Sequence, residues 1–412
     1  MNYAVWLLSQ LKRQLWWQAI LFVAIGVATA LIAMVSDRFF PWTLPFTVSR
    51  EAVDSLLNII ASSMLAVTTF SLGAVTAAFG AATSNVTPRA TKLLMEDKVT
   101  HNVLSTFIGA FIFSIVGIIV LRTGSYGDEG RAVLFVITIA VIALIVIQLL
   151  RWINHLISLG RVGNTIQQLE ETTELALKLR QQQPYLEANP WEDTDDLPEE
   201  AVAILAEDVG YIQFVDIAAL SRICDDGNLQ LWLPQNSGSF VYTDTVLCYV
   251  AGPLKESQKK KLADQFVIAA TRTFDQDPRF GLAVLAEVGS RALSSATNDP
   301  GTALDILTRQ TRLLTKWSEG REDKPVKYPR LHVHPISDED LFEDAFMLIA
   351  RDGAGLIEIQ LRLQKSLAAL QRLGSEQFRA AARHQSKIAL ERAREGLTAR
   401  HDLERLLKAV EG

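Results

Sequence analysis

The sequence has few of the features that identify an enzyme or a disulfide-stabilised protein. Two cysteines occur among its 412 residues, Cys224 and Cys248. They are too few for a disulfide framework or a cysteine-rich metal site, and we expect both to be buried and reduced. The sequence has no glycine-rich phosphate loop, no nucleophile elbow and no zinc-type spacing of cysteine and histidine. We therefore expect no catalytic site, no metal and no cofactor.

Charge is scarce in the first third of the chain. Residues 1–150 carry nine Lys/Arg and seven Asp/Glu, whereas residues 151–412 carry thirty-one and thirty-nine. The acidic balance of the second part argues against nucleic acid as a partner, because binding to phosphates needs clustered Lys and Arg. In place of charge, the first part has long apolar runs, which indicate a lipid bilayer as its surroundings.

Four charge-free stretches reach or approach the length of about 20 apolar residues that a helix needs to cross a bilayer. We predict an α-helical transmembrane domain over residues 1–160, with four spans at about residues 15–35, 56–79, 103–121 and 132–150. The first span follows Lys12 and Arg13, as a secretion signal would. Its apolar core is too long for such a signal, so we predict that it is retained.

Lys and Arg residues near the ends of the spans predict the orientation. Seven lie before the first span, in the second loop or after the fourth span, and four lie in the loops of the opposite side. Positive residues are enriched on the cytoplasmic side of membrane proteins. Both termini are therefore predicted to be cytoplasmic.

The second span is polar for a membrane helix. Small and polar residues recur in it at intervals of three and four, which places them on one stripe of the helix. The stripe consists of Asn58, Ser62, Ala66, Thr69, Gly73, Thr76 and Gly80. One interpretation is close helix packing, with hydroxyls bonding across the contact. The other is the wall of a water-filled path, in which hydroxyls replace part of an ion's hydration shell.

The rest of the chain is predicted to be an α+β domain, mostly helical, with a small β-rich unit. Residues 161–200 predict a connecting helix followed, from residue 184, by an acidic linker with three prolines. Residues 201–254 alternate apolar and polar side chains with β-branched and aromatic enrichment, which predicts strands around a short helix, Ile217–Cys224. Residues 255–412 predict a helical domain, with helices at 256–275, 279–296, 300–317, 338–352, 355–373 and 375–410.

His332 and His334 alternate along a short segment that is predicted to be extended, so they point the same way. Two histidines alone are a weak metal signal. The carboxylates that begin at Asp338 are typical of the first turn of a helix. We therefore predict no metal site at this pair.

Several segments resemble the bacterial membrane family known as domain of unknown function 2254. They are SSMLAVTTFSLGAVTAAF, SNVTPRATKLLMEDKVTHNVLSTFIGAF, GYIQFVD, SGSFVYTDTVLCYVAGPL, RTFDQDPRFGLAVLAEVGSRALSSATNDPGTALDIL and HVHPISDEDLFEDAFMLIARDGA. The resemblance implies a multispan protein of the bacterial inner membrane with a cytoplasmic domain. It implies no particular activity.

The family-like residues of the C-terminal region form a polar motif. They are Arg272, Gln276, Asp277, Phe280, Gly281, Arg291, Asn298, Asp299 and Pro300. Asn298 or Asp299 is expected to cap the next helix, with Pro300 in its first turn. Arg272 or Arg291 is expected to pair with Asp277 or Asp299. The motif is either a structural knot of hydrogen bonds between helices or a polar site for a small ligand or a neighbouring subunit.

These features predict a homo-oligomeric ion channel or pore, with the second span facing its axis and the cytoplasmic domain forming a vestibule or gate. The absence of ionisable residues from the spans argues against a proton relay. The alternative is a membrane-anchored sensor or scaffold that conducts nothing. The expected partners are the lipid bilayer, further copies of the chain and inorganic ions.

Overall fold

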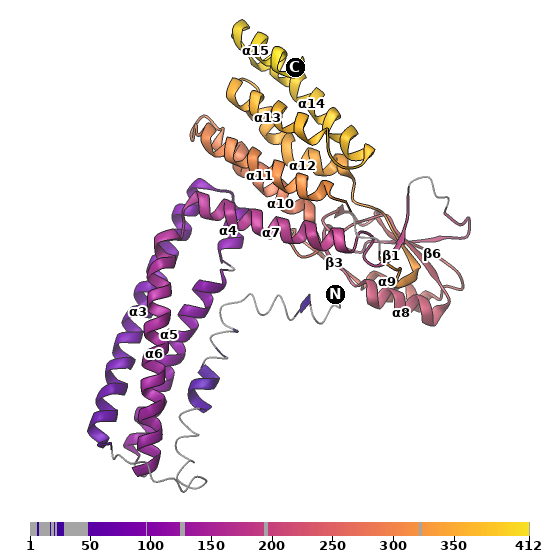
Figure 1. Ribbon diagram of the computed structural model, residues 1–412. Coiled ribbons are helices and arrows are strands. Elements are labelled where there is room, and N and C mark those ends of the chain that lie inside the picture. Colours follow the sequence, from indigo (N-terminus) through magenta and orange to yellow (C-terminus); the bar gives the residue numbers. More distant parts are fainter. Residues whose placement is uncertain are drawn as a thin grey trace. The chain divides into compact units, whose positions relative to one another are not determined.

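The computed structural model describes residues 48–95, 97–123, 128–192, 197–320 and 324–411, together with 6–7, 17, 20 and 23–28. The chain divides into two compact units (Figure 1). We call Trp6–Ser84 with Thr91–Asn164 the membrane unit, and Thr165–Gly412 with Asn85–Ala90 the C-terminal unit. The first predicted span falls mainly outside the described residues.

The described part of the membrane unit is built on three long helices, α3 (Arg50–Asn85), α5 (Lys98–Arg122) and α6 (Asp128–Ser158). Each contains a segment long and apolar enough to cross a bilayer. The second, third and fourth predicted spans lie within these helices. At 1.5 Å per residue, the 36 residues of α3 measure about 54 Å, which exceeds the ~30 Å hydrocarbon core.

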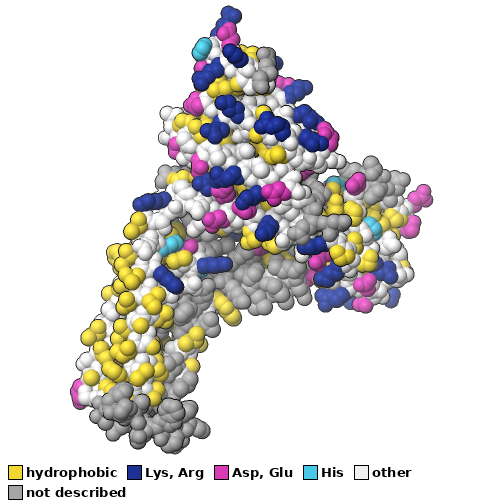
Figure 2. Space-filling model, in the orientation of Figure 1, with side chains coloured by type: hydrophobic (Ala, Val, Ile, Leu, Met, Phe, Trp, Pro, Cys, Tyr) yellow, Lys and Arg dark blue, Asp and Glu magenta, His cyan; other side chains and the backbone are white. Residues whose placement is uncertain are grey.

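Apolar side chains hold the three helices together. Leu57 of α3, Phe113 of α5 and Leu134 of α6 are fully buried against one another. Polar contacts lie at the helix ends instead: Arg122 Nε is 3.3 Å from Asp54 Oδ1. At the other end of α5, Asp97 caps the helix and its Oδ2 lies 2.8 Å from Nε2 of His155. Figure 2 shows that apolar side chains, coloured yellow, cover much of the surface of these helices.

Two small sheets form one part of the described C-terminal unit. The larger has the order β1 (Ala188–Pro190), β8 (Tyr328–Val333), β4 (Gln230–Leu233), β6 (Val246–Ala251) and β2 (Val202–Leu205), and β8 is parallel to both of its neighbours. The smaller is antiparallel, in the order β5 (Phe240–Val241), β3 (Gly210–Val215) and β7 (Phe266–Ala269). Helices α8 (Ile217–Gly227) and α9 (Glu256–Ala263) complete this part.

The sheets extend beyond the predicted β-rich unit of residues 201–254. Strand β1 lies in the predicted linker and β7 in the predicted helix 256–275, while β8 includes His332, whose segment was predicted to be extended within the otherwise helical region. Each of these strands is short, and each is stabilised by pairing with a strand distant in sequence. The segments of β1 and β7 carry no alternation long enough to predict them.

The remaining helices of the described C-terminal unit form a two-layered stack. They are α10 (Pro278–Ala292), α11 (Pro300–Ser318), α12 (Asp338–Asp352), α13 (Ile357–Leu370), α14 (Glu376–Gly396) and α15 (Arg400–Glu411). In one layer α12 packs between α10 and α14, and in the other α13 packs between α11 and α15 (Figure 1). Successive helical hairpins stacked in this way are typical of α-solenoids.

The predicted helix 375–410 is two helices. A Cβ on Gly396 would lie 2.7 Å from the carbonyl carbon of Ala354, so the two backbones touch where α14 ends. This contact joins segments about forty residues apart, and a local pattern does not predict it.

Helix α7 (Val162–Gln182) follows α6 directly and packs into the C-terminal unit. Its buried face includes Ile166, Leu169, Thr173 and Leu177. At Gly281 of α10 the approach to α7 is so close that a Cβ would lie 2.0 Å from Oγ1 of Thr173. A larger residue at position 281 would force the helices apart.

We expect Gly281→Ala to destabilise the C-terminal unit by about 1–3 kcal/mol, the usual cost of overpacking. Thermal unfolding of the purified full-length chain, followed by tryptophan fluorescence, measures this change. Gly163→Ala is the control, since a Cβ there meets no described atom within 4 Å and alanine has the better helix propensity. Equal unfolding midpoints for the two variants would contradict the packing of α7 on α10.

Candidate functional site

All seven residues of the predicted stripe on α3 are exposed: Asn58, Ser62, Ala66, Thr69, Gly73, Thr76 and Gly80. The face of α3 that packs in the membrane unit includes Val53, Leu57, Ile60, Met64 and Val75, all buried. At 3.6 residues per turn, the centres of the two faces lie roughly 150° apart. The stripe therefore points away from the described helices of its own chain.

The glycines make the stripe hollow. A Cβ built on Gly73 or Gly80 meets no atom of the described residues within 4 Å. Large apolar residues flank the stripe, among them Leu65, Phe70 and Leu72, which are 54%, 70% and 56% exposed. Among the described residues no helix of the same chain packs against the stripe, so the packing interpretation would need a partner outside them or in a second copy of the chain.

The hydroxyl groups of the stripe bond to the backbone of their own helix. Ser62, Thr69 and Thr76 donate to the carbonyl oxygens four residues earlier, at 2.9, 2.9 and 2.8 Å. Each hydroxyl hydrogen is therefore used within the helix. A hydroxyl oxygen that has donated keeps its lone pairs, so the stripe presents acceptors, which suit a cation or a donor group.

The polar motif of the C-terminal unit centres on Asp277, which is 1% exposed. Its carboxylate accepts two bonds from Arg272, from Nε at 2.7 Å and from Nη2 at 3.0 Å, and one from the backbone N–H of Phe280. Burial raises the pKa of Asp277, and the Arg272 guanidinium opposes that shift. The guanidinium carbon of Arg272 also lies 5.1 Å from the centre of the Phe280 ring. Of the ion pairs that the sequence left open, the structure therefore forms that of Arg272 with Asp277.

The loop before β5 closes over this ion pair. Gly238 has φ +97°, and a Cβ on it would lie 2.3 Å from Oδ2 of Asp277. Beside it, Oε1 of Gln276 accepts bonds from Oγ of Ser237 at 2.9 Å and from the backbone N–H of Val215 at 3.0 Å. The sheet, the loop and α10 meet here with little room for a ligand, which favours the structural interpretation of this half of the motif.

The other half of the motif lies at the start of α11. Asp299 caps this helix: it accepts from the backbone N–H of Thr302 at 3.1 Å and from the Thr302 hydroxyl at 2.6 Å. These bonds lower the pKa of Asp299. Asn298 precedes it with φ +50°. Arg291 lies on α10, where it lines a separate pocket with Glu287 and Ser290.

His332 lies on β8 and His334 follows the last residue of that strand, and each meets a tryptophan. The ring of His332 stacks on Trp232 with centroids 4.9 Å apart, and His334 meets Trp191 edge-on at 6.1 Å. Among the described residues no group of three or more His, Cys, Asp or Glu side chains could hold a metal ion.

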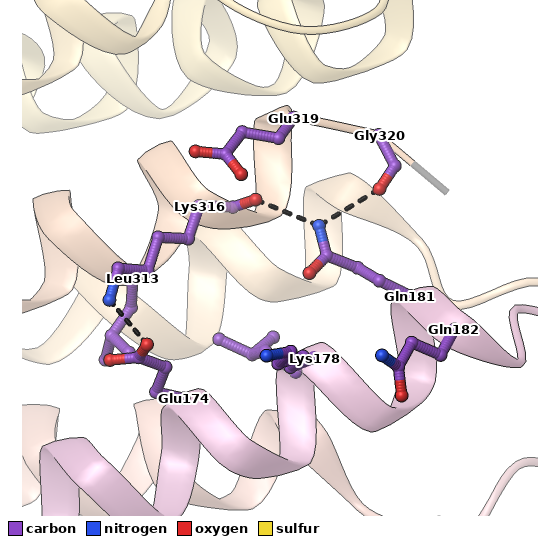
Figure 3. Close-up of a pocket in the computed structure, with 9 residues that line it drawn as sticks. Glu174, Lys178, Gln181, Gln182, Leu313, Lys316, Glu319 and Gly320 are labelled. Carbon is purple, nitrogen blue, oxygen red and sulfur yellow. Dashed lines mark hydrogen bonds and ion pairs between the residues drawn. The ribbon is translucent and has the colours of Figure 1, made fainter. Parts of the chain in front are cut away.

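Helix α7 contacts α11 through side chains that the sequence does not single out. Glu170 accepts bonds from Arg309 and Arg312, both on α11. Three turns later the side chain of Gln181 donates to the carbonyl oxygens of Lys316, Trp317 and Gly320, at 2.9, 3.1 and 3.1 Å. Figure 3 shows Gln181 with Lys316 and Gly320 at a cleft of about 450 Å³ between α7 and α11. The residues that pair here are about 140 positions apart, so no local sequence pattern predicts that they meet.

Long apolar helices joined to a large α+β domain define a membrane protein. The family model described as "Predicted membrane protein (DUF2254)" matches residues 12–369. The chain therefore belongs to the DUF2254 family.

Two relatives are the uncharacterized protein Mb1321c of Mycobacterium bovis and the uncharacterized protein Rv1290c of Mycobacterium tuberculosis. Each is 30% identical to this chain over 116 residues, which is 27% of this chain and 22% of the relative. The chain thus aligns with about a fifth of the length of these relatives. No solved structure matches the chain.

The two Asp-Pro helix starts allow a matched test of the buried ion pair. We expect Asp277→Ala to destabilise the C-terminal unit by about 3–5 kcal/mol, because it leaves the Arg272 charge buried without its partner. Asp299→Ala removes an exposed cap and should cost only about 1 kcal/mol. Urea unfolding of the full-length protein in detergent measures both. Similar losses in the two variants would argue against the ion pair as the stabilising contact.

The cysteines test the core between the sheets and α8. Cys224 and Cys248 are free and fully buried. Burial raises the pKa of both thiols, that of Cys224 to about 12. Since the thiolate is the reactive form, we expect no labelling by a maleimide at pH 8 in the folded protein and labelling of both after unfolding.

The positive control for the labelling is Ser257→Cys, on the exposed face of α9, which should react at once. Reaction of Cys224 or Cys248 at the same rate as this control, before unfolding, would show that the core is not closed.

Proposed function

We propose that this membrane protein is a homo-oligomeric ion channel in which α3 of each subunit faces a common axis. The observation that carries the proposal is the outward direction of the stripe. Among the described residues the stripe is a narrow polar face on a single helix, and such a face cannot enclose a path by itself. Several copies arranged around an axis would bring their stripes together and cover them.

The chemistry of the stripe favours a cation as the permeant ion. Ser62, Thr69 and Thr76 use their hydrogens within the helix, so their oxygens are left to face the path. Hydroxyl oxygens can replace part of the hydration shell of a small cation. The hollows at Gly73 and Gly80 leave space for an ion that keeps some of its water.

The proposed orientation has both termini in the cytoplasm of a bacterial cell, with the protein in the inner membrane. Asn85–Ala90 and Thr165–Gly412 belong to one compact unit, so the end of α3 and the start of α7 share a side. Arg89, Lys92 and Lys98 lie on that side, in keeping with the preference of positive residues for the cytoplasm. The C-terminal unit would then form a vestibule or gate.

A membrane-anchored sensor or scaffold is the second candidate, and the stack of helical hairpins α10–α15 favours it. Such stacks offer extended surfaces that are commonly used to bind other proteins. In that case the stripe on α3 would join subunits and conduct nothing.

Single-channel recording from the purified full-length protein in planar bilayers distinguishes the two candidates. We expect discrete currents, reduced about fivefold by Thr69→Val or Thr76→Val, since one hydrogen-bonding group contributes about 1 kcal/mol. Thr76→Leu should block the current, because it also fills the path.

Thr68→Val is the matched control. Thr68 is the neighbour of Thr69 and bonds to its own helix in the same way, at 2.6 Å from the carbonyl oxygen of Met64, but it lies off the stripe and is half-buried. Oligomers that stay silent under varied voltage, tension and ions would contradict the channel. A current that Thr68→Val changes as much as Thr69→Val would contradict the assignment of the stripe to the path.

A further inference from the structure

The outer side of α14 carries a stripe of positive charge. Lys and Arg recur on it at intervals of four, four and seven residues, which keeps them on one side of the helix. At 3.6 residues per turn this side lies roughly opposite to the buried residues of α14, which include Phe378, Ala382 and Ala389. Figure 2 shows many Lys and Arg side chains, in dark blue, over this end of the helical stack. We call the four residues of the stripe the basic face: Arg379, Arg383, Lys387 and Arg394.

The basic face is only partly neutralised within the chain. Glu376 pairs with both Arg379 and Arg383, whose side chains stay 38% and 50% exposed. Lys387 and Arg394 are exposed, and neither has an ion-pair partner among the described residues. Like charges one turn apart on a helix repel each other. The basic face is therefore suited to contact with an acidic surface.

An acidic surface lies in the same unit, at one edge of the larger sheet. Strand β2 is the last strand of that sheet, and two exposed carboxylates precede it and two follow it. Residues 184–221 contain ten Asp/Glu and no Lys or Arg. Helix α9, with its lysines, packs beside β2, yet in the described part of the chain no cation pairs with these four carboxylates. We call them the acidic edge: Glu199, Glu200, Glu207 and Asp208.

The strand between these carboxylates is apolar and uncovered. Val202 and Leu205 are 40% and 46% exposed. Within the described ranges no strand pairs with the outer side of β2. An open apolar edge invites pairing with other chains, and a helix laid over it is one way to cover it. The long stems of Arg and Lys can cover apolar surface while their charged ends reach acids beside it.

The basic face and the acidic edge also agree in length. From Glu200 to Glu207 an extended chain measures at most about 23 Å. From Arg379 to Arg394 a helix rises about 22 Å. Cations along α14 can therefore meet carboxylates at both ends of β2.

We propose that the basic face of α14 in one copy of the chain packs against the acidic edge of β2 in the next copy. The two surfaces differ, so the contact is heterologous, and such contacts form a ring when the rotation between copies closes. A basic face against another basic face would bring like charges together. The proposal rests on the proposed homo-oligomer and names the surfaces through which the C-terminal units meet.

Cross-linking between two differently tagged full-length chains, co-expressed and purified in detergent, tests the contact. One chain carries Ala380→Cys beside the basic face, and the other carries Ala203→Cys on β2; both positions are exposed. A flexible bismaleimide should join the two chains into a product that carries both tags. Arg383→Glu with Lys387→Glu should slow this reaction about tenfold, because two exposed attractions are replaced by repulsion.

A charge exchange makes the test specific to the two surfaces. Glu207→Lys with Asp208→Lys, on the chain that carries Ala203→Cys, should also slow the reaction about tenfold. When the reversed acidic edge meets the reversed basic face, opposite charges face each other again. The rate should then return to within about twofold of the original, since the coupling of two contacting sites is not additive.

Arg362→Glu with Lys365→Glu is the matched control. Both residues are exposed on α13, and neither has an ion-pair partner among the residues that the structure describes. This variant changes the net charge by the same amount and should leave the rate unchanged. Unfolding midpoints equal to that of the wild type show that each variant folds.

Three results would overturn the proposal: no cross-link between chains that co-purify, equal slowing by the reversals on α13 and α14, or no recovery on charge exchange. Failure of the two tags to co-purify would instead contradict the assembly of several copies itself. The assay measures no current, so a silent channel and a missing contact are distinguishable.

Discussion

Hydrocarbon offers no hydrogen-bonding partner to a polar group, and this constraint arranges the membrane unit. Ion pairs and polar caps lie at the helix ends, as with Asp54 and Arg122 or with Asp97 and His155. Between them the hydroxyls of the stripe on α3 donate to carbonyl oxygens of the same helix. The hydroxyl groups of the outward stripe therefore need no acceptor outside α3. The shape of the stripe then decides which molecules can pack against it. A hollow at Gly73 and Gly80, bordered by large apolar side chains, fits water or a neighbouring helix better than a disordered lipid chain.

The C-terminal unit depends on a different constraint, which is that a buried charge needs a fixed partner. Asp277 and Arg272 satisfy one another where the sheet, the loop at Gly238 and α10 converge. The chain then runs through α10 and α11, returns to the larger sheet as β8, and re-enters the stack at α12. Because β8 pairs with both β1 and β4, the sheets and the helical stack are interleaved along the chain. The knot around Asp277 lies at the joint between them, so its loss should affect both parts.

The sequence predicts those features that a local pattern determines. Apolar length predicts the three long helices, alternation predicts β3, β4 and β6, and Asp299 with Pro300 predicts the start of α11. What it does not predict depends on distant partners. The segment 266–269 is a strand because β3 lies beside it, and α14 ends at Gly396 because Ala354 lies against it.

The candidate site divides in the same way, into features that a local pattern predicts and features that depend on distant partners. Arg272 and Asp277 are five residues apart, and their pairing was one of the combinations that the sequence left open, whereas the closure by Gly238 was not predicted. The stripe was visible as a period of three and four, but its direction required knowledge of the opposite face of α3.

Two segments of the chain link the membrane unit to the C-terminal unit. One is α7, which continues from α6 and is held to α11 by Glu170 and Gln181. The other is the turn Asn85–Ala90, which ends α3 and is held to α10 by the Arg89–Glu287 pair. The helix that carries the stripe is thus joined within a few residues to the helical stack.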